Sequence, residues 1–479
     1  MRTALAAKNN QNVVGGHVFA FNPWRCSPSR RDVLKAHRSF IRKAKPAVQP
    51  DKRLKAAQTL ITHLADHLDA DLYVRLWDGE KIPLGTRPES TVGVAIHTPT
   101  ALTRLARRPR FDTIVSCLAS GEIEIEGGTL LDLAAKRGEM QTKKLFKRLN
   151  KALLIKSALP FVFGSAQETA RHDFTGKIAD KKEAGRDDKA LVQFHYDLSN
   201  HFYGLFLDPE MQYSCAYYPR WDASLEEAQK AKLDMICRKL RLQKGEKFLD
   251  IGCGWGGLVC HAAQHYGVEA YGVTLSQAQL DFTKAKIERL GLADRVHVEL
   301  RDFRDISGTF DKIASIGMFE HVGIDNHQAY FQKMHDLLKP RGLLLNHAIA
   351  RPAKRDDKSF RKQNSQYRAI TTYIFPGGEL DHIGMSLANL ERNRFEVLDV
   401  EAWREHYART CRLWCERLYA HRDAAAAEVG DAKLRIWLLY LAGCALAFER
   451  GAVGIFQTLV SKKSKGSAGL PPTRADWYE

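Results

Sequence analysis

Short apolar runs alternate with amphipathic stretches between about residue 230 and residue 350. Each run is bounded by glycine or polar residues and is followed by apolar positions at helical spacing, a pattern typical of buried parallel strands joined by helices. The pattern predicts an α/β domain with a doubly wound sheet, in which ligands bind at the carboxyl ends of the strands. The five expected strands lie in EKFLDIGCGWGG, VEAYGVTLS, RVHVELRDF, FDKIASIG and GLLLNHAIA.

The chain before residue 191 has another pattern. Apolar positions at helical spacing in LKAAQTLITHLADHL follow an irregular basic arm, and strand-like runs separated by turns begin at Asp71. One of these turns predicts a hairpin around Asp78-Gly79. The predicted organisation is an irregular arm at 1–55, a small α+β accessory domain at 56–140, a basic amphipathic and charged linker at 141–190, the α/β domain at 191–462 and a C-terminal tail at 463–479.

The composition is that of a globular protein, since 44% of the 479 residues are hydrophobic and 27% are charged. No apolar run is long enough for a membrane-spanning helix and the N-terminus lacks a signal-peptide core, so a cytoplasmic protein is expected. The nine cysteines show no C-x-x-C spacing. This argues against a zinc site or a disulfide framework and predicts reduced thiols.

The formal charge of +17 is concentrated near the N-terminus. Residues 1–60 contain 13 Lys and Arg against Asp32 and Asp51, a local balance of 13 − 2 = +11. Such a segment suits a solvated tail, a nucleic-acid contact or an anchor for anionic lipid. The basic amphipathic stretch at 143–163 suits either a membrane surface or an ordinary surface helix packed on its neighbour.

A glycine-rich loop follows the first strand of the α/β domain. Glycines there allow a sharp turn and a close approach of the backbone to a ligand, while the next helix offers free N–H groups. The loop alone is a weak signal, shared with dinucleotide-binding enzymes and with purely structural turns. Asp250 before the loop, without a Walker lysine, makes it similar to motif I of S-adenosylmethionine-dependent methyltransferases. Its glycines are Gly252, Gly254, Gly256 and Gly257.

This resemblance implies further cofactor contacts. In such enzymes a carboxylate after the second strand takes the ribose hydroxyls, and an acidic residue after the third strand lies near the adenine. Asp302 fits the third-strand position. The second strand departs from the pattern, because Thr274, Ser276 and Gln279 stand where Asp or Glu is usual.

Longer motifs narrow the resemblance. The chain resembles the cyclopropane-fatty-acyl-phospholipid synthases and mycolic acid cyclopropane synthases over about residues 190–462, and its accessory domain more loosely resembles that of the longer bacterial members. The resemblance implies a Rossmann-like class I methyltransferase domain with a helical lid. The matching motifs are DIGCGWGG, GVTLS, HYDLSNHFYGLFLDPEMQYSCAYY, SIGMFEHVG, YIFPGGEL, HYARTCRLW and YLAGCALAFERG.

The resemblance also implies a reaction and its residues. A methyl group passes from S-adenosylmethionine to a cis double bond in a phospholipid acyl chain, carbocation character develops, and a bound bicarbonate removes a proton before the ring closes. The implied catalytic residues are Cys215 and Ile349 through their main chain, Glu320 and His347 as groups that orient bicarbonate, Tyr407 through its hydroxyl, and Cys444. The implied cofactor residues are Tyr213, Ser214, Asp250, Gly252, Gly254, Gly256, Gly257, Thr274, Gln279, Asp302 and Phe303.

Structural roles stay open for several of these residues. His347 on an apolar strand also suits a core histidine bonded to a backbone carbonyl, and Glu320 suits an ion pair with an arginine. Cys444 lies on an apolar helix without a nearby histidine or lysine to lower its pKa, which favours a structural cysteine. The aromatic residues Phe319, Phe375 and Tyr217 suit either a developing cation or plain core.

The leading hypothesis is a cytoplasmic enzyme bound peripherally to the inner face of the cell membrane, with the basic arm and residues 143–163 contacting anionic lipids. Alternatives are an enzyme that makes methyl-branched or methylene chains from the same cation, a small-molecule N-methyltransferase, and a nucleic-acid binder. The last leaves the glycine loop unexplained, so no nucleic-acid partner is expected. A homodimer is left open, and the sequence does not decide the double-bond position or the head group.

Overall fold

The computed structural model describes residues 51–68, 70–85, 90–136, 147–163, 198–362, 378–466 and 469–478. The chain divides into two compact units, Met1–Asp51 and Lys52–Glu479, and the following description concerns the second. The predicted basic arm lies outside the described residues up to residue 50. Helix α2 begins at Lys52, inside the stretch predicted as irregular up to residue 55, because Lys, Arg, Leu and Ala there are strong helix formers.

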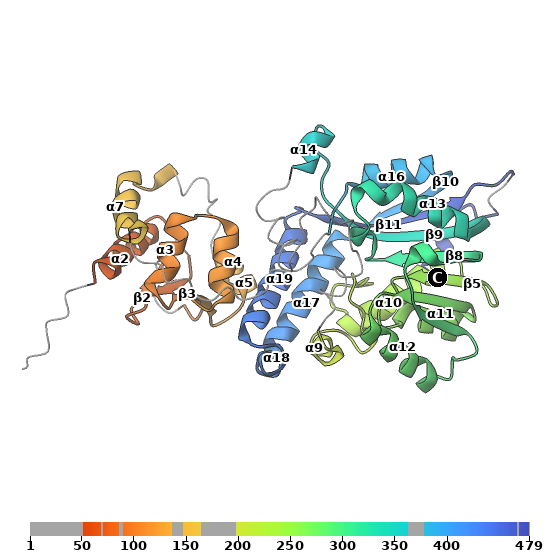
Figure 1. Cartoon of the computed structure of the whole chain (residues 1–479), viewed down its shortest axis with the longest axis horizontal. Coiled ribbons are helices and arrows are strands. Elements are labelled where there is room, and N and C mark those ends of the chain that lie inside the picture. The colour runs from red at the N-terminus through yellow and green to blue at the C-terminus, as the bar shows by residue number, and fades with distance from the viewer. Residues whose placement is uncertain are drawn as a thin grey trace, which may run out of the picture. The chain divides into compact units, whose positions relative to one another are not determined.

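Residues 52–163 contain a four-stranded sheet with the order β2-β1-β3-β4 and several helices (Figure 1). β1 and β2 are antiparallel and enclose the predicted hairpin turn, where Gly79 has a φ of 90°. The four strands and the helices other than α5 share a buried cluster, which includes Val74, Ile96 and Ile123. The elements are α2 (Lys52–Ala65), β1 (Tyr73–Arg75), β2 (Lys81–Pro83), β3 (Gly93–Ile96), α3 (Pro99–Arg107), α4 (Phe111–Ala119), β4 (Ile123–Glu126), α5 (Leu130–Lys136) and α7 (Lys151–Val162).

A seven-stranded sheet with the order β10-β11-β9-β8-β5-β6-β7 forms the centre of the remaining chain (Figure 1). All five predicted strands are present, and they pair in parallel: β5 with β6 and β8, β6 with β7, and β8 with β9. The predicted doubly wound α/β fold is therefore confirmed. These strands are β5 (Lys247–Ile251), β6 (Glu269–Thr274), β7 (Val296–Leu300), β8 (Phe310–Ile316) and β9 (Leu338–Ala350).

Two strands at one edge of this sheet were not predicted. β10 (Phe395–Ala402) and β11 (Gly454–Lys462) pair antiparallel with each other, and β11 pairs antiparallel with β9. Residues 403–453, most of which are helical, separate them in sequence, so no strand-helix alternation points to them. The register places Gln457 of β11 opposite His347 of β9.

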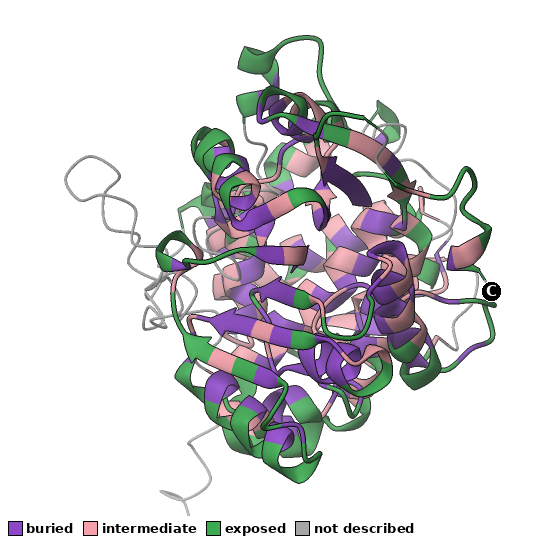
Figure 2. Ribbon diagram, turned by 90° about the vertical axis from the view of Figure 1, so that its right-hand side faces the viewer, coloured by how far each residue is buried: buried purple, intermediate pink, exposed green. Residues whose placement is uncertain are grey.

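Helices pack on both faces of the seven-stranded sheet. Along β5, Phe248 belongs to a buried cluster that includes side chains of α10 and α11, whereas Leu249 belongs to a cluster that includes side chains of α13. Successive strand residues point to opposite faces, so the sheet separates two cores, and its central strands are largely buried (Figure 2). The helices are α9 (Asn200–Gly204), α10 (Leu225–Lys239), α11 (Gly257–Tyr266), α12 (Gln277–Arg289), α13 (His327–Leu337), α14 (Asp357–Arg361) and α16 (Ile383–Arg392).

Three further helices, α17 (Arg404–Ala420), α18 (Arg422–Val429) and α19 (Asp431–Glu449), form the predicted helical lid. α17 and α19 pack side by side (Figure 1). Trp414 of α17 and Trp437 of α19 contact the ring of Tyr213, with centroid distances of 5.3 and 6.3 Å. Among the helices within the described ranges, none is both long and apolar enough to cross a bilayer.

Candidate active site

The glycine loop lies at the carboxyl edge of the sheet, between the end of β5 at Ile251 and the start of α11 at Gly257. Gly252, Gly254 and Gly256 have φ values of 79°, 55° and 74°, which residues with a side chain rarely adopt. The N–H of Gly252 donates to the carbonyl of Val273 on β6 at 3.0 Å. The loop therefore makes the sharp turn that its glycines predict.

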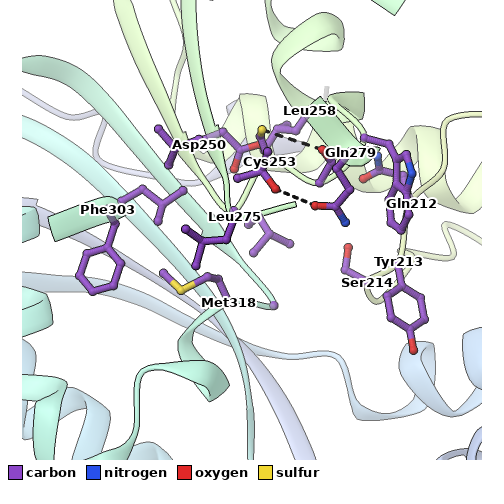
Figure 3. A pocket seen from close by; sticks show the side chains of 18 of the residues that line it. Gln212, Tyr213, Ser214, Asp250, Cys253, Leu258, Leu275, Gln279, Phe303 and Met318 are labelled. Carbon is purple, nitrogen blue, oxygen red and sulfur yellow. Dashed lines mark hydrogen bonds between the residues drawn. The ribbon is translucent and has the colours of Figure 1, made fainter. Parts of the chain in front are cut away.

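A cavity lies over the carboxyl ends of β5, β6 and β8 (Figure 3). Every predicted cofactor residue except Gly256 and Gly257 lines it. Tyr213 and Ser214 lie across the cavity from Asp250 and Phe303 (Figure 3). Residues that the sequence analysis did not single out also line the cavity, among them Gln212, Lys232, Leu275, Arg301, Met318 and His321.

Gly256 and Gly257 shape the cavity without lining it. A Cβ atom on Gly257 would lie 1.8 Å from Nε2 of Gln212, and a Cβ atom on Gly256 would lie 2.3 Å from Cγ2 of Thr283. The Thr283 hydroxyl donates to the Gly254 carbonyl at 3.3 Å, so a displaced Thr283 also disturbs the loop. Both positions require glycine because the neighbouring side chains fill the space.

The second strand ends in a hydroxyl, and the helix after it contributes an amide, where a carboxylate is usual. Thr274 is the last residue of β6, and its hydroxyl donates to Oε1 of Gln279 at 2.7 Å. This bond engages the amide oxygen, so the NH2 group is the side-chain donor that Gln279 offers to the cavity. The pair suits a ribose hydroxyl that accepts a hydrogen bond.

Asp302 presents a charged carboxylate at the cavity wall. It accepts two side-chain hydrogen bonds from Arg304, at 2.9 Å from Nε to Oδ1 and 2.6 Å from Nη2 to Oδ2. Burial acts to raise the pKa of Asp302, but the hydrogen bonds from Arg304 hold it below its ordinary value. Phe303 beside it packs edge-on against Tyr330, at a centroid distance of 5.2 Å. A carboxylate next to an aromatic wall suits recognition of a nucleoside.

A buried lysine, Lys232, and a buried aspartate, Asp250, line the cavity next to the glycine loop. Burial raises the pKa of Asp250 to about 7, and the charge of Lys232 opposes the shift. Burial lowers the pKa of Lys232 to about 8, and its ammonium donates to Oγ of Ser214 at 3.0 Å. Within the described residues, Oδ1 of Asp250 is buried without a hydrogen-bond partner. This acceptor suits the amino group of a methionine moiety, so the cavity fits S-adenosylmethionine.

Glu320 lies in a short 3-10 turn, Phe319–His321, directly after β8. Its Oε1 accepts a hydrogen bond from the backbone N–H of Ile349 at 2.7 Å, whereas Oε2 is buried without a partner in the described part of the chain. Burial raises the pKa of Glu320 to about 7, the backbone N–H opposes the shift, and Asp381 adds to it. No arginine forms an ion pair with Glu320 among the described residues, which disfavours the alternative role.

His347 is 1% exposed on β9, two residues before Ile349. Its Nδ1 lies 3.2 Å from Nε2 of Gln457, and its Nε2 is buried without a hydrogen-bond partner in the described ranges. Burial lowers the pKa of His347 well below its ordinary value, and the charges of Lys232 and Lys239 act in the same direction. The ring is therefore neutral. Among the described residues, neither of its nitrogens bonds a backbone carbonyl, as the structural alternative required.

Cys215 and Tyr407 lie close to these two residues. Sγ of Cys215 is 3.8 Å from the carbonyl oxygen of Trp403, whose ring meets that of His347 at right angles with centroids 5.1 Å apart. Burial raises the pKa of Tyr407 well above its ordinary value, and the neighbouring Cys215 and Glu320 contribute to the shift. These contacts connect five of the six predicted catalytic residues, including Ile349, in one group. Ser214 and His321, which line the cavity, are chain neighbours of Cys215 and Glu320. The catalytic roles of the five residues stay predictions.

Cys444 lies on α19 and borders this group through Cys411, whose thiol pKa is raised by burial and further by both Cys444 and Cys215. Burial raises the thiol pKa of Cys444 to about 12, which a hydrogen bond with Tyr440 only partly offsets. A thiol with this pKa is not a nucleophile at neutral pH, so a structural role is favoured, as the sequence suggested. Its catalytic role stays an unsupported prediction.

The aromatic residues singled out from the motifs pack in several places. Phe319 contacts Tyr330 and Phe331 at centroid distances of 5.3 and 5.1 Å, within a buried core. Tyr217 contacts Trp403 at 5.0 Å, close to His347. Phe375 lies outside the described residues. Phe319 is therefore core, whereas Tyr217 borders the candidate site.

Comparison with solved structures places the fold among known enzymes. The cyclopropane synthase MmaA2 from Mycobacterium tuberculosis has 35% sequence identity and a TM-score of 0.54, over 61% of this chain and 100% of that chain. The mycolic acid cyclopropane synthase CmaA1, solved with SAH and CTAB, has 37% identity and a TM-score of 0.54, over 57% of this chain and 98% of that chain. The fold and the cavity define a class I S-adenosylmethionine-dependent methyltransferase.

Family membership follows from longer matches. The model of the family described as mycolic acid cyclopropane synthetase matches residues 183–458, which is more than half of the chain. A probable fatty acid methyltransferase from Pseudomonas putida is 38% identical over 420 residues, 86% of this chain and 97% of the relative. Another, from Mycobacterium tuberculosis, is 34% identical over 81% of this chain and 91% of its own length. The chain belongs to the mycolic acid cyclopropane synthetase family.

Proposed function

We propose that this methyltransferase is a cyclopropane-fatty-acyl-phospholipid synthase, which adds a methylene group to the cis double bond of an unsaturated acyl chain. The observation that carries the proposal is the pair of buried, unpartnered atoms Oε2 of Glu320 and Nε2 of His347 in the described residues. Such atoms cost several kcal/mol if they stay unpaired, roughly 1–3 kcal/mol for each neutral group and more for a charge. A small polar group bound between them, such as bicarbonate, offsets this cost.

The proposed roles follow from the groups present. S-adenosylmethionine supplies an electrophilic methyl group, whose bond to sulfur breaks as its bond to an alkene carbon forms. The other alkene carbon becomes cationic, and loss of a proton from the added methyl group closes the three-membered ring. The neutral His347 donates from Nε2, and Glu320 orients the proton acceptor, so neither residue needs to be the base itself.

The site fits bicarbonate by its chemistry. Bicarbonate has both acceptor oxygens and one hydroxyl donor, and it can pair with an N–H donor at one end and a carboxylate at the other. Burial of Glu320 and His347 removes competing water, which strengthens such bonds. The Ile349 N–H bonds Glu320 directly and therefore acts by fixing the carboxylate.

Lipid analysis tests the reaction. Cells that lack any such enzyme, after they express this chain, are expected to contain acyl chains that have gained one CH2 group, measured by mass spectrometry of their fatty acids. A matched culture expressing Glu320→Gln serves as the control for background. Unchanged lipids, together with S-adenosylmethionine binding by the purified protein, would contradict the proposal.

A methyl-branching or methylene-forming enzyme is the second candidate, and the names of the two fatty acid methyltransferase relatives favour it. A methyl-branched alkene forms if the cation loses the proton of the carbon that carries the new methyl group. A methylene branch forms if that hydrogen first shifts as hydride to the cationic carbon and the methyl group then loses a proton. A cyclopropane chain and a methylene-branched chain have the same mass, but only the latter takes up hydrogen on mild catalytic reduction. A small-molecule N-methyltransferase is less favoured: coclaurine N-methyltransferase, at 22% identity and a TM-score of 0.51, has a similar fold only.

We further propose that α7 contacts an anionic bilayer surface. Ile155 and Leu159 of α7 are 65% and 47% exposed, and Phe163, directly after the helix, is 83% exposed, so apolar groups recur every four residues along one side of this segment. Lys151 and Lys156 lie exposed on the same helix and provide charge for anionic head groups. Acyl substrates in a membrane make such a surface useful.

Vesicle sedimentation tests the role of α7. The double substitution Ile155→Asp with Phe163→Asp is expected to weaken binding to phosphatidylglycerol vesicles by about tenfold or more, because it places two charges in the acyl boundary. Ile114→Asp, at another exposed apolar residue on α4, is the matched control. Equal losses for both variants, or no loss for the double variant, would contradict the assignment.

A further inference from the structure

A hydrogen-bonded chain of buried side chains runs from α10 to His347. The Lys239 ammonium is fully buried at the end of α10 and donates to Oε1 of Gln457 on β11 at 2.8 Å. Nε2 of Gln457, in turn, lies 3.2 Å from Nδ1 of His347 on β9. The Glu401 carboxylate forms an ion pair with Lys239 at the outer end of the chain.

The donors and acceptors along this chain have only one consistent arrangement. An ammonium has no acceptor, so the group of Gln457 that faces Lys239 must be its oxygen. The NH2 group of Gln457 then faces His347, and Nδ1 of His347 must accept. A neutral imidazole carries one proton, so that proton lies on Nε2, the atom without a partner in the described residues.

An ion pair and two aromatic rings favour the charged form of Lys239. Burial lowers the pKa of Lys239, and the Glu401 carboxylate opposes this shift. The ammonium also lies 5.3 Å from the ring centre of Trp403 and 5.5 Å from that of Trp477, where cation–π attraction stabilises it. Trp403 in addition meets the ring of His347 edge-on, so one side chain supports both ends of the chain.

We propose that Gln457, oriented by Lys239, is a positioning residue that sets the tautomer of His347 so that Nε2–H projects into the catalytic site as a hydrogen-bond donor. The inference rests on the proposed function for what that donor binds, but the tautomer itself follows from the contacts alone. Without Gln457, the proton would distribute over both ring nitrogens, and part of the enzyme would present a lone pair to an anion. The arrangement also excludes His347 as a general base in the resting enzyme.

Nitrogen NMR of the histidine-labelled protein tests the assignment, with His347→Ala identifying the His347 signals. The wild-type ring is expected to be neutral with its proton on Nε2. Gln457→Glu places a carboxylate against Nδ1, so the proton is expected to move to Nδ1 or the ring to become cationic. Lys239→Met leaves Gln457 free to turn its amide and is expected to give a mixture of tautomers.

Turnover provides a second measurement. Gln457→Glu is expected to lower kcat by about 10–100-fold while the Kd for S-adenosylhomocysteine changes less than about twofold. Gln243→Glu, at an exposed residue before β5, adds the same charge as a control and is expected to behave as the wild type. A wild-type proton on Nδ1, or a tautomer unchanged in Gln457→Glu, overturns the inference. Unmodified lipids with the expected tautomer would instead overturn the proposed function alone.

Discussion

Glu320→Gln is expected to lower turnover by about a hundredfold or more while the Kd for S-adenosylhomocysteine stays nearly unchanged. The amide retains an oxygen that accepts from the Ile349 N–H, so the local backbone should persist. It replaces Oε2, the atom that we propose accepts from the hydroxyl of bicarbonate, with an NH2 group that can only donate. Single-turnover kinetics and calorimetric titration with S-adenosylhomocysteine measure the two effects separately.

The same substitution should change the pH dependence of stability. The folded-state pKa of Glu320 is raised from 4.5 to about 7, so between these values the folded state holds a proton that the unfolded state has lost. The stability that Glu320 contributes is therefore full below about pH 4.5 and is lost as the pH rises through about 7. The Glu320→Gln variant avoids this loss. The unfolding free energy of the variant minus that of the wild type should therefore be about 3 kcal/mol larger near pH 8 than near pH 4.

Glu288→Gln, at an exposed residue of α12, is the control for the measurements of turnover and of the pH dependence of unfolding. It should leave both turnover and the pH dependence of unfolding as in the wild type. A parallel loss of turnover and cofactor affinity in Glu320→Gln would identify a purely structural carboxylate. A flat stability difference across pH would show that Glu320 has the same pKa in the folded and the unfolded protein.

The hydrophobic pattern predicted the centre of the fold because parallel strands and their helices alternate regularly along the chain. β10 and β11 escaped the prediction for a physical reason: they close the edge of the sheet from distant parts of the sequence. β10 is half buried, and β11 directly follows the lid helices, so neither belongs to a repeating strand-helix unit. The pairing of β11 with β9, and of β10 with β11, depends on tertiary contacts rather than on a local sequence pattern.

The site was predicted best where the backbone itself imposes the residue type. Positive φ values require glycine in the loop, and Glu320 interrupts an apolar run at the end of a strand. Lys232 and Lys239 were missed because lysines in a helix usually face water. Their spacing carried a signal, since seven residues place both on the buried face of α10. The contact of Lys239 with Gln457, 218 residues away, is not visible in a sequence.

Gly256→Ala is expected to destabilise the protein and to weaken cofactor binding by about tenfold or more. Gly256 has a φ of 74°, and a Cβ atom there would lie 2.3 Å from Cγ2 of Thr283, which is fully buried and therefore cannot move freely. The left-handed backbone alone costs about 1–2 kcal/mol for a residue with a side chain. The collision should add about 1–3 kcal/mol and shift Thr283 away from the Gly254 carbonyl.

Gly291→Ala separates these two contributions, because Gly291 has a φ of 67° but no atom within 4 Å of its added Cβ. It should lose only about 1–2 kcal/mol of unfolding free energy and bind S-adenosylhomocysteine normally. Chemical denaturation and titration calorimetry of both variants measure the difference. Equal destabilisation, with cofactor affinity intact in both, would mean that the loop relaxes around the new methyl group and that backbone conformation alone selects glycine at position 256.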